Sequence, residues 1–282
     1  MCSGTEIVKR IEQALREGVK VLSPFTSGSV KADRKPSDGS LVTEADRCVN
    51  RALREFLPQD EEGWLSEEDA DDLKRLRKKG VWVVDPLDGT REFVAGIPEW
   101  TISVAMVEEG RAIAGGICNP ATGEVFLGSK ETGVTYNGVP VQASKRHYLE
   151  GAVVLASRTE VERGEWACYE ASRLVVRPTG SIAYKLARVA AGLADATWTF
   201  DGRNAWDIAA GVALIEAAGG CVQFFPNLRP AFNKKSTRFP GLFACGPFLR
   251  DQVAALLASC IRTPFSEITP VAFGQKTSPH ER

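Results

Sequence analysis

Two aspartates three positions apart carry the strongest chemical signal in the sequence. Asp85 follows the apolar residues 81–84, and residues 86–90 read Pro-Leu-Asp-Gly-Thr. Because proline stiffens a turn and glycine permits unusual backbone angles, Asp85, Asp88 and the carbonyl of Leu87 can point oxygens at one spot. Mg²⁺ prefers such oxygen ligands at about 2.0–2.1 Å in an octahedral array. The segment therefore predicts a magnesium site.

The residues that follow predict an anion site beside the metal ligands. Gly89, Thr90 and Arg91 would begin a helix or turn whose first backbone N–H groups have no partner within the helix. A phosphate can dock on such N–H groups. One short segment thus offers metal ligands and phosphate donors side by side.

Further carboxylates stand at positions that suit a metal site but also have structural explanations. Glu67 lies in the acidic run 66–69, Asp207 opens an apolar helical run, and Asp46 lies in the first turn of a helix with a capping box. Taken singly, Asp46 could merely cap its helix, and Asp207 could be stabilised by the helix dipole. The acidic run could face solvent, and Asp88 could belong to an ordinary turn.

Asp85 has no such simple explanation. It ends a strongly apolar segment, where an ionised carboxylate needs a partner or a metal. No single-site explanation accounts for the co-occurrence of all these patterns in one chain.

Composition narrows the class of protein. The 282 residues are 44% hydrophobic and 25% charged, as in a soluble globular protein of one large or two ordinary domains. With 35 basic and 36 acidic residues the net charge is −1, which argues against a nucleic acid polymer as partner but not against a nucleotide ligand. No apolar run suits a membrane span or a signal peptide, and the seven cysteines are scattered. We expect a cytoplasmic protein with free thiols and no membrane partner.

The scarcity of histidine excludes several catalytic classes. The only two histidines are His147 and His280. The chain therefore has almost no histidine that could form a histidine-rich zinc site or a Ser–His–Asp triad. The nucleophile-elbow, dinucleotide-binding and P-loop patterns are absent as well. Chemistry must therefore come from carboxylates, hydroxyls, basic side chains, backbone groups or metals.

The first half of the chain predicts two helices and a sheet that would position these residues. Apolar residues at every fourth position predict a helix from about residue 5, and a second helix is expected from Thr43. Between them lies a Gly/Ser/Lys-rich loop, and residues 69–79 are charged and expected to be exposed. Closely spaced segments predict an antiparallel sheet with strands at 81–84, 101–107, 111–117 and 124–127 and a hairpin at 136–139.

The second half alternates helices and strands, which predicts a mixed α/β arrangement. The expected strands are 152–156, 221–225 and 242–245, and the expected helices are 181–191, 207–218 and 248–260. We predict an N-terminal α+β half over 1–145 with the metal motifs, and a C-terminal α/β half over 146–272 that completes the site. Residues 273–282 are predicted to be a disordered tail.

The combination of motifs resembles the inositol monophosphatase superfamily of Mg²⁺-dependent, lithium-sensitive phosphomonoesterases. The matching segments are 41–46, 66–68, 84–90 and 206–211. Their order and spacing match, and the resemblance covers nearly the whole chain. It implies a layered αβαβα fold with an antiparallel N-terminal sheet, a smaller C-terminal α/β half and the site between them. It is compatible with a homodimer.

The resemblance also implies a set of metal ligands. Glu67, Asp85 and the Leu87 carbonyl would hold a first Mg²⁺. Asp85, Asp88 and Asp207 would hold a second, and a third, looser Mg²⁺ is compatible with the pattern.

The remaining roles implied by the resemblance concern water and phosphate. Asp46 and Thr90 would position the attacking water, with Glu67 assisting. The backbone of Gly89 and Thr90 would hold the phosphate. Gly180-Ser181, followed by an apolar helix, is similar to the second substrate-contacting segment of the family.

Two departures favour one branch of the superfamily. After the metal motif, Arg91-Glu92-Phe93 looks like the 3'(2'),5'-bisphosphate nucleotidase branch, as does the stretch 173–191. Inositol enzymes carry a glutamate seven residues before the Trp-Asp aspartate, where this chain has Phe200. The Phe200 ring could stack on a nucleotide base, although packing explains it equally well.

We therefore expect hydrolysis of the 3'-phosphate of adenosine 3',5'-bisphosphate, giving AMP and phosphate. One alternative is an inositol or sugar phosphate as the small-molecule substrate. An alternative of another class is a non-catalytic phosphate- or metal-binding homologue, which the complete ligand set disfavours.

Overall fold

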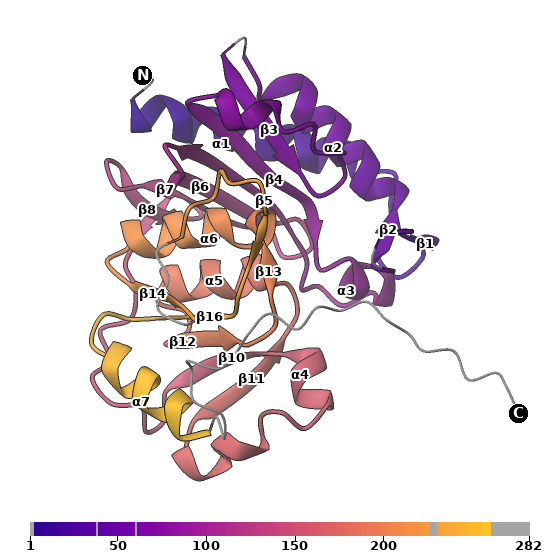
Figure 1. The fold of residues 1–282 in the computed structure, drawn as a ribbon. Helices are drawn as coiled ribbons and strands as arrows, with labels where there is room; N and C mark the ends of the chain where they lie inside the picture. Colours follow the sequence, from indigo (N-terminus) through magenta and orange to yellow (C-terminus); the bar gives the residue numbers. More distant parts are fainter. Residues whose placement is uncertain (1–2, 38, 60, 226–229, 261–282) are drawn as a thin grey trace, which may run out of the picture.

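The computed structural model describes residues 3–260 except 38, 60 and 226–229. Helices and sheets alternate in layers, as Figure 1 shows, and this confirms the predicted layered α/β fold. In the described part of the chain, no helix is long and apolar enough to cross a membrane. The tail predicted over 273–282 lies outside the described residues.

Two helices form the first outer layer. Helix α1 (Gly4–Val21) and helix α2 (Glu44–Phe56) pack on each other and on one face of the large sheet. The buried face of α1 includes Ile7, Ile11 and Leu15, which confirms the stripe expected from the fourfold spacing. Thr43 caps α2, as its sequence indicates.

The second layer is a sheet of seven strands in sequence order. Its members are β3 (Glu62–Ser66), β4 (Gly80–Asp88), β5 (Thr101–Glu108), β6 (Arg111–Asn119), β7 (Glu124–Ser129), β8 (Gly133–Tyr136) and β9 (Val139–Val141). All pairs are antiparallel except β3 and β4, which are parallel. Strand β4 does not end at Asp85 as expected. It continues through an irregularity to Asp88, so both aspartates belong to the strand.

Helices α5 (Ile182–Ala190) and α6 (Ala205–Ala217) form the middle layer. They pack on each other, on the large sheet and on a second sheet, and their apolar side chains join one continuous core. Helix α6 is apolar on all sides because sheets and α5 surround it.

The second sheet and its outer cover complete the layers. Its strand order is β11 (Val175–Thr179), β10 (Val153–Ser157), β12 (Ala196–Thr199), β16 (Leu242–Cys245) and β14 (Cys221–Phe224). The outer face is covered by α4 (Arg158–Glu162), η2 (Ala167–Ser172) and α7 (Arg250–Cys260). Shorter elements are β1 (Ala32–Arg34), β2 (Leu41–Thr43), η1 (Lys74–Arg77), α3 (Thr90–Ala95), β13 (Arg203–Asn204) and β15 (Arg238–Phe239).

Several local expectations are wrong. Strands β3, β11 and β12 were not expected, and the loop over 27–40 contains the short strand β1. The charged stretch 69–79 is not wholly exposed, because Arg75 is 2% exposed and pairs with Asp71. Cys118 is buried and Cys48 is half-buried.

Candidate functional site

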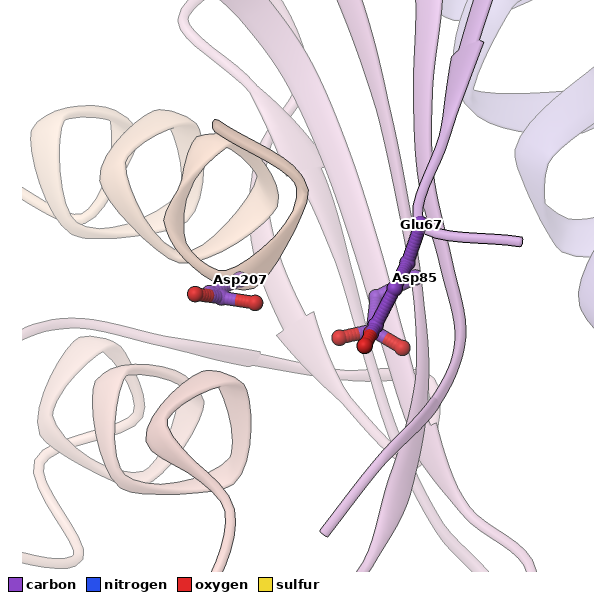
Figure 2. Close-up of side chains that lie close together, drawn as sticks. All are labelled: Glu67, Asp85 and Asp207. Atoms are coloured by element: carbon purple, nitrogen blue, oxygen red, sulfur yellow. The ribbon is translucent and has the colours of Figure 1, made fainter. Parts of the chain in front are cut away.

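The acidic motifs converge on one cavity. The cavity has a volume of about 350 Å³ and is lined by segments that follow β3, β4, β10 and β11 and by the start of α6. Figure 2 shows Glu67, Asp85 and Asp207 with their carboxylates directed at one another. One oxygen of each lies within 4.8 Å of the others. Three segments that are far apart in the sequence thus form one carboxylate cluster.

Asp85 lies at the centre of this cluster and is 1% exposed. Its Oδ1 accepts a hydrogen bond from the Leu87 amide at 3.0 Å, whereas Oδ2 is buried with no hydrogen-bond partner. Burial, and then the charges of Glu67, Asp88 and Asp207, raise the pKa of Asp85 well above its usual range. A buried carboxylate oxygen without a donor is what a bound cation would satisfy.

Asp207 contributes from the first turn of α6. Its Oδ2 accepts a hydrogen bond from the Asn204 amide at 2.7 Å, so one oxygen caps the helix. Burial, followed by the charges of Glu67 and Asp88, raises the pKa of Asp207 to about 8. Burial likewise raises the pKa of Glu67, against the opposing effect of Lys35.

Lys35 is a residue of the site that the sequence analysis missed. Its Nζ lies 2.7 Å from carboxylate oxygens of both Glu67 and Glu68. Although burial opposes the charge, the two carboxylates raise the pKa of Lys35 above its usual range. The only sequence signal was its place in a Gly/Ser/Lys-rich loop, which does not distinguish it from an ordinary surface lysine.

The donor set of the cluster fits a hard divalent cation. Glu67, Asp85 and Asp207 offer oxygen only, and the Asp85 Oδ2 has no donor of its own. Neither cysteine nor histidine belongs to this cluster of described residues. Oxygen-only sites suit Mg²⁺, whereas zinc sites favour nitrogen and sulfur ligands.

Thr90 and Asp46 form a second polar group next to the cluster. The Thr90 Oγ1 lies 3.2 Å from both the Asp46 Oδ1 and the Leu87 carbonyl oxygen. The other Asp46 oxygen accepts hydrogen bonds from the amide and hydroxyl of Thr43, so Asp46 also closes the capping box of α2. Asp46 is 2% exposed, and burial raises its pKa.

The predicted phosphate donors lie at the start of α3. Gly89 has a φ of 95°, and a Cβ there would lie 2.9 Å from the Glu99 carbonyl oxygen. Only glycine therefore fits this position without strain. Gly89, Thr90 and Arg91 all line the cavity, with Arg91 exposed.

Asp88 is held by the second half of the chain. Its Oδ2 accepts hydrogen bonds from the Ser181 hydroxyl at 2.5 Å and from the Ala183 amide at 2.7 Å. Gly180 and Ser181 line the cavity, and a Cβ on Gly180 would lie 2.4 Å from the Glu92 side chain. Asp88 lines the cavity too, beside the cluster of three carboxylates.

Four basic residues also line the cavity and form what we call its basic wall: Arg158, Arg163, Lys185 and Arg203. The acidic residues Glu92 and Asp201 line the cavity as well. Phe200 is not among the residues that line the cavity. Its ring is 41% exposed and stacks on Phe225 with centroids 5.0 Å apart.

Comparisons with known proteins identify the family of the chain. The model of the inositol monophosphatase family matches residues 4–235. The inositol-1-monophosphatase of Rhizobium meliloti is 36% identical over 194 residues, covering 66% of this chain and 71% of that protein. A Thermotoga maritima protein named fructose-1,6-bisphosphatase/inositol-1-monophosphatase is 33% identical and covers 68% and 75%. The solved structure of a Thermotoga maritima IMPase superposes with a TM-score of 0.75 at 27% identity, covering 91% and 96%.

The match extends over most of the chain, and the fold, the cavity and the carboxylates agree with it. The chain belongs to the inositol monophosphatase family and is a phosphoric monoester hydrolase.

Proposed function

We propose that this chain removes the 3'-phosphate of adenosine 3',5'-bisphosphate in a Mg²⁺-dependent hydrolysis that yields AMP and phosphate. The observation that carries the proposal is the basic wall of the cavity. A monophosphate ester has one phosphate, which would occupy the carboxylate end with its cations. The basic wall indicates a second anionic group on the substrate.

Lys185 is the strongest element of that wall. It is 3% exposed, and its Nζ donates a hydrogen bond to the Thr179 carbonyl at 3.2 Å. Within the described residues it has no carboxylate at salt-bridge distance. Burial, and then the charge of Arg203, lower the pKa of Lys185 to about 8. The charges of Asp88, Glu160 and Glu92 oppose this lowering, but none of these carboxylates forms an ion pair with Lys185. A buried ammonium group without a direct ion pair favours a substrate that brings its own negative charge.

Two arginines add donors to the same wall. The Nε atoms of Arg158 and Arg203 are buried and have no hydrogen-bond partner. Arg158 is anchored by Glu99 at 2.6 Å, and Arg203 donates to the Thr199 hydroxyl at 3.2 Å. These contacts hold the two guanidinium groups in place at the cavity wall. Guanidinium groups in that position suit phosphate oxygens, which accept charge-assisted hydrogen bonds.

The carboxylate end of the cavity would carry the hydrolysis. Glu67, Asp85, Asp207, Asp88 and the carbonyl of residue 87 would hold two or three Mg²⁺ ions. These ions supply an acidified water and neutralise phosphate charge. Because a water activated in this way would be the nucleophile, the hydrolysis needs no histidine and no covalent phosphoenzyme.

The chain's own polar groups would orient the water and the phosphate. Thr90 donates its hydroxyl proton toward Asp46, which leaves its lone pairs to accept a hydrogen bond from water. That contact would direct the water oxygen at phosphorus, opposite the leaving ribose oxygen. The amides of Gly89 and Thr90 would bind the phosphate oxygens.

The second candidate is an inositol or sugar monophosphate. It is favoured by the relatives, since the Rhizobium meliloti protein is named an inositol-1-monophosphatase. The Thermotoga maritima protein carries both a bisphosphatase and a monophosphatase name, so one family member is named for both kinds of substrate. Lithium inhibition, a cytoplasmic location and a homodimer remain predictions under either substrate.

The test compares phosphate release from three esters with Mg²⁺ and with EDTA. They are adenosine 3',5'-bisphosphate, adenosine 3'-monophosphate and inositol 1-phosphate. We expect the bisphosphate to have the highest kcat/KM, and EDTA to abolish all activity. Preference for inositol 1-phosphate would refute the nucleotide assignment while keeping the metal-dependent hydrolysis.

A variant separates the second-phosphate contact from a general effect on the site. Lys185→Met keeps the volume of the side chain but removes its charge. It should lower kcat/KM for the bisphosphate by about 10–100-fold, and leave adenosine 3'-monophosphate nearly unchanged. Equal losses on both nucleotides would show that Lys185 acts on the carboxylate cluster instead.

A further inference from the structure

Two cysteines of the second sheet face each other across neighbouring strands. Cys221 in β14 is the direct register partner of Cys245 in β16, and the strands are antiparallel. Both contact the apolar cluster between this sheet and α7. They belong to no part of the carboxylate site, and neither lines its cavity.

The register gives this pair the geometry of a disulfide. Directly opposed residues of antiparallel strands have Cα atoms about 4.5–5.5 Å apart and side chains on the same face. A disulfide requires Cα atoms about 4.4–6.8 Å apart. The register brings Cys221 and Cys245 into that range, with both side chains on one face of the sheet. The pair therefore meets the distance condition for a disulfide.

The two thiols differ in access and acidity. Cys221 is half-buried, and contact with the Cys245 thiol lowers the pKa of Cys221 to about 7 despite the opposing effect of burial. Arg250 also lowers it, whereas Asp251 and Glu216 raise it. Cys245 is fully buried, and the contact raises its pKa. Cys221 is thus the thiol that meets a reagent first, and Cys245 is the partner held beside it.

We propose that Cys221 and Cys245 form a reversible intramolecular disulfide by exchange with a low-molecular-weight disulfide such as glutathione disulfide. The Cys221 thiolate attacks one sulfur of glutathione disulfide, which forms a mixed disulfide and releases one glutathione thiolate. The Cys245 sulfur then attacks the Cys221 sulfur and releases the second glutathione, which takes up the Cys245 proton. The protein loses two electrons and two protons, and glutathione disulfide is reduced to two glutathione molecules.

Another cysteine pair provides the internal comparison. The Cys260 thiol donates to the carbonyl oxygen of Cys168 at 3.5 Å. No strand register fixes the separation of these two Cα atoms, since Cys168 lies in η2 and Cys260 ends α7. Replacing Cys168 should therefore leave the proposed bond intact.

The experiment uses the full chain incubated at pH 7.5 with glutathione disulfide, then alkylated and digested with trypsin without reductant. Cys221 is the only cysteine of the tryptic peptide 204–234, and Cys245 is the only one of 239–250. We expect most of these two peptides to be recovered as one linked species that dithiothreitol separates. Circular dichroism before digestion verifies that the chain is folded.

Three variants make the result decisive. Cys245→Ala keeps an apolar group in the core and should trap a glutathione adduct on peptide 204–234, because the second step is blocked. Cys221→Ser should leave peptide 239–250 without a link or a glutathione adduct, and Cys168→Ser should retain the link. A folded wild-type chain that gives no linked peptide would overturn the proposal. So would a glutathione adduct at Cys221 that persists in the wild type.

Discussion

Replacing Asp85 by asparagine should produce opposite effects on the stability of the metal-free protein and on its activity. The side chain keeps its shape and its hydrogen bond from the Leu87 amide. In place of the partnerless Oδ2, the new amide nitrogen would face Glu67 and Asp207, whose carboxylates can accept its protons. An unsatisfied buried group costs about 1–3 kcal/mol, so the metal-free variant should be more stable by about that amount at pH 8.

The same change should nearly abolish turnover. The cations contribute several kcal/mol of transition-state stabilisation, and a loss of about 4 kcal/mol corresponds to about 10³-fold in kcat. Stabilisation by Mg²⁺ should disappear as well, and it amounts to about 2.7 kcal/mol when the cation is at 100 times its Kd. Urea unfolding without Mg²⁺ measures the stability of the metal-free variant, and unfolding with Mg²⁺ measures the stabilisation by the cation. Phosphate release measures the loss of turnover.

Asp195→Asn provides the matched control. Asp195 is also buried, but its oxygens accept hydrogen bonds from the Ser144 hydroxyl, the Val153 amide at 2.7 Å and the Arg146 Nε at 3.2 Å. Removing its charge should therefore destabilise the chain by about 1–3 kcal/mol and spare Mg²⁺ binding. The reasoning fails if Asp85→Asn destabilises the metal-free protein as Asp195→Asn does, or if it keeps activity within about tenfold of the wild type.

Four further predictions concern the cavity and its surroundings. Thr90→Val should retain Mg²⁺ binding, measured by calorimetry, but lose about 10²-fold in kcat, because the contact with Asp46 is removed. Thr90→Ser should restore most of the lost kcat. An unchanged kcat in the valine variant would contradict the proposed water contact. The apparent Mg²⁺ affinity should fall by up to about tenfold per pH unit below pH 8. Burial raises the pKa of Asp207 to about 8, so cation binding at lower pH must displace the proton of this carboxyl. An affinity that does not change between pH 6 and 8 would contradict this prediction. In the metal-free chain, the free energy of unfolding should change with pH in the opposite direction. The folded state binds the Asp207 proton more tightly than the unfolded chain does, so this free energy should fall as pH rises from about 4 to 8. Phe200→Ala should change KM for adenosine 3',5'-bisphosphate less than threefold, because the ring stacks on Phe225 outside the cavity lining. A tenfold rise in KM would instead support the hypothesis that the ring stacks on the nucleotide base.

Much of the fold could be predicted because its elements carry local signals. The fourfold apolar spacing of α1 and the capping box at Thr43 act within a few residues, and both predicted helices are present. The aspartates of 85–90 were identified because a carboxylate in an apolar strand is costly without a partner. Their convergence with Asp207 was expected only from the resemblance to known phosphatases, since spacing along the chain does not bring residue 207 to residue 85.

What could not be predicted depends on tertiary contacts. Strand β3 has only five residues and pairs in parallel with β4. Parallel strands are not joined by a tight hairpin turn, so the sequence between them does not indicate the pairing. Arg75 is buried because Asp71, Asn233 and the Lys234 carbonyl surround its guanidinium, and Asn233 is 158 residues away. Lys35 reaches Glu67 and Glu68 from a loop whose composition indicates only flexibility.

The two explanations that sequence reasoning set against each other for the aspartates are compatible, because a carboxylate has two oxygens. Asp207 caps α6 through the Asn204 amide and also belongs to the carboxylate cluster. One oxygen of Asp46 closes the capping box of α2, and the other meets Thr90.

Asp85 and Asp88 follow the same rule. Asp85 anchors Oδ1 on the Leu87 amide, and Asp88 anchors Oδ2 on Ser181 and the Ala183 amide. Each carboxylate thus has a hydrogen bond to one of its oxygens. For Asp46, Asp85 and Asp207 the donor lies within three residues, so the contact forms together with the helix or strand. Asp88 differs, because its donors come from the start of α5, 93 and 95 residues away. These contacts orient mutually repelling carboxylates independently of the cations. A substitution that removes the anchor and leaves the carboxylate, such as Ser181→Ala for Asp88, should therefore weaken Mg²⁺ binding without removing a ligand, by about 10–100-fold in Kd measured by calorimetry. Unchanged affinity in that variant would mean that the cations themselves, rather than the anchors, order the site.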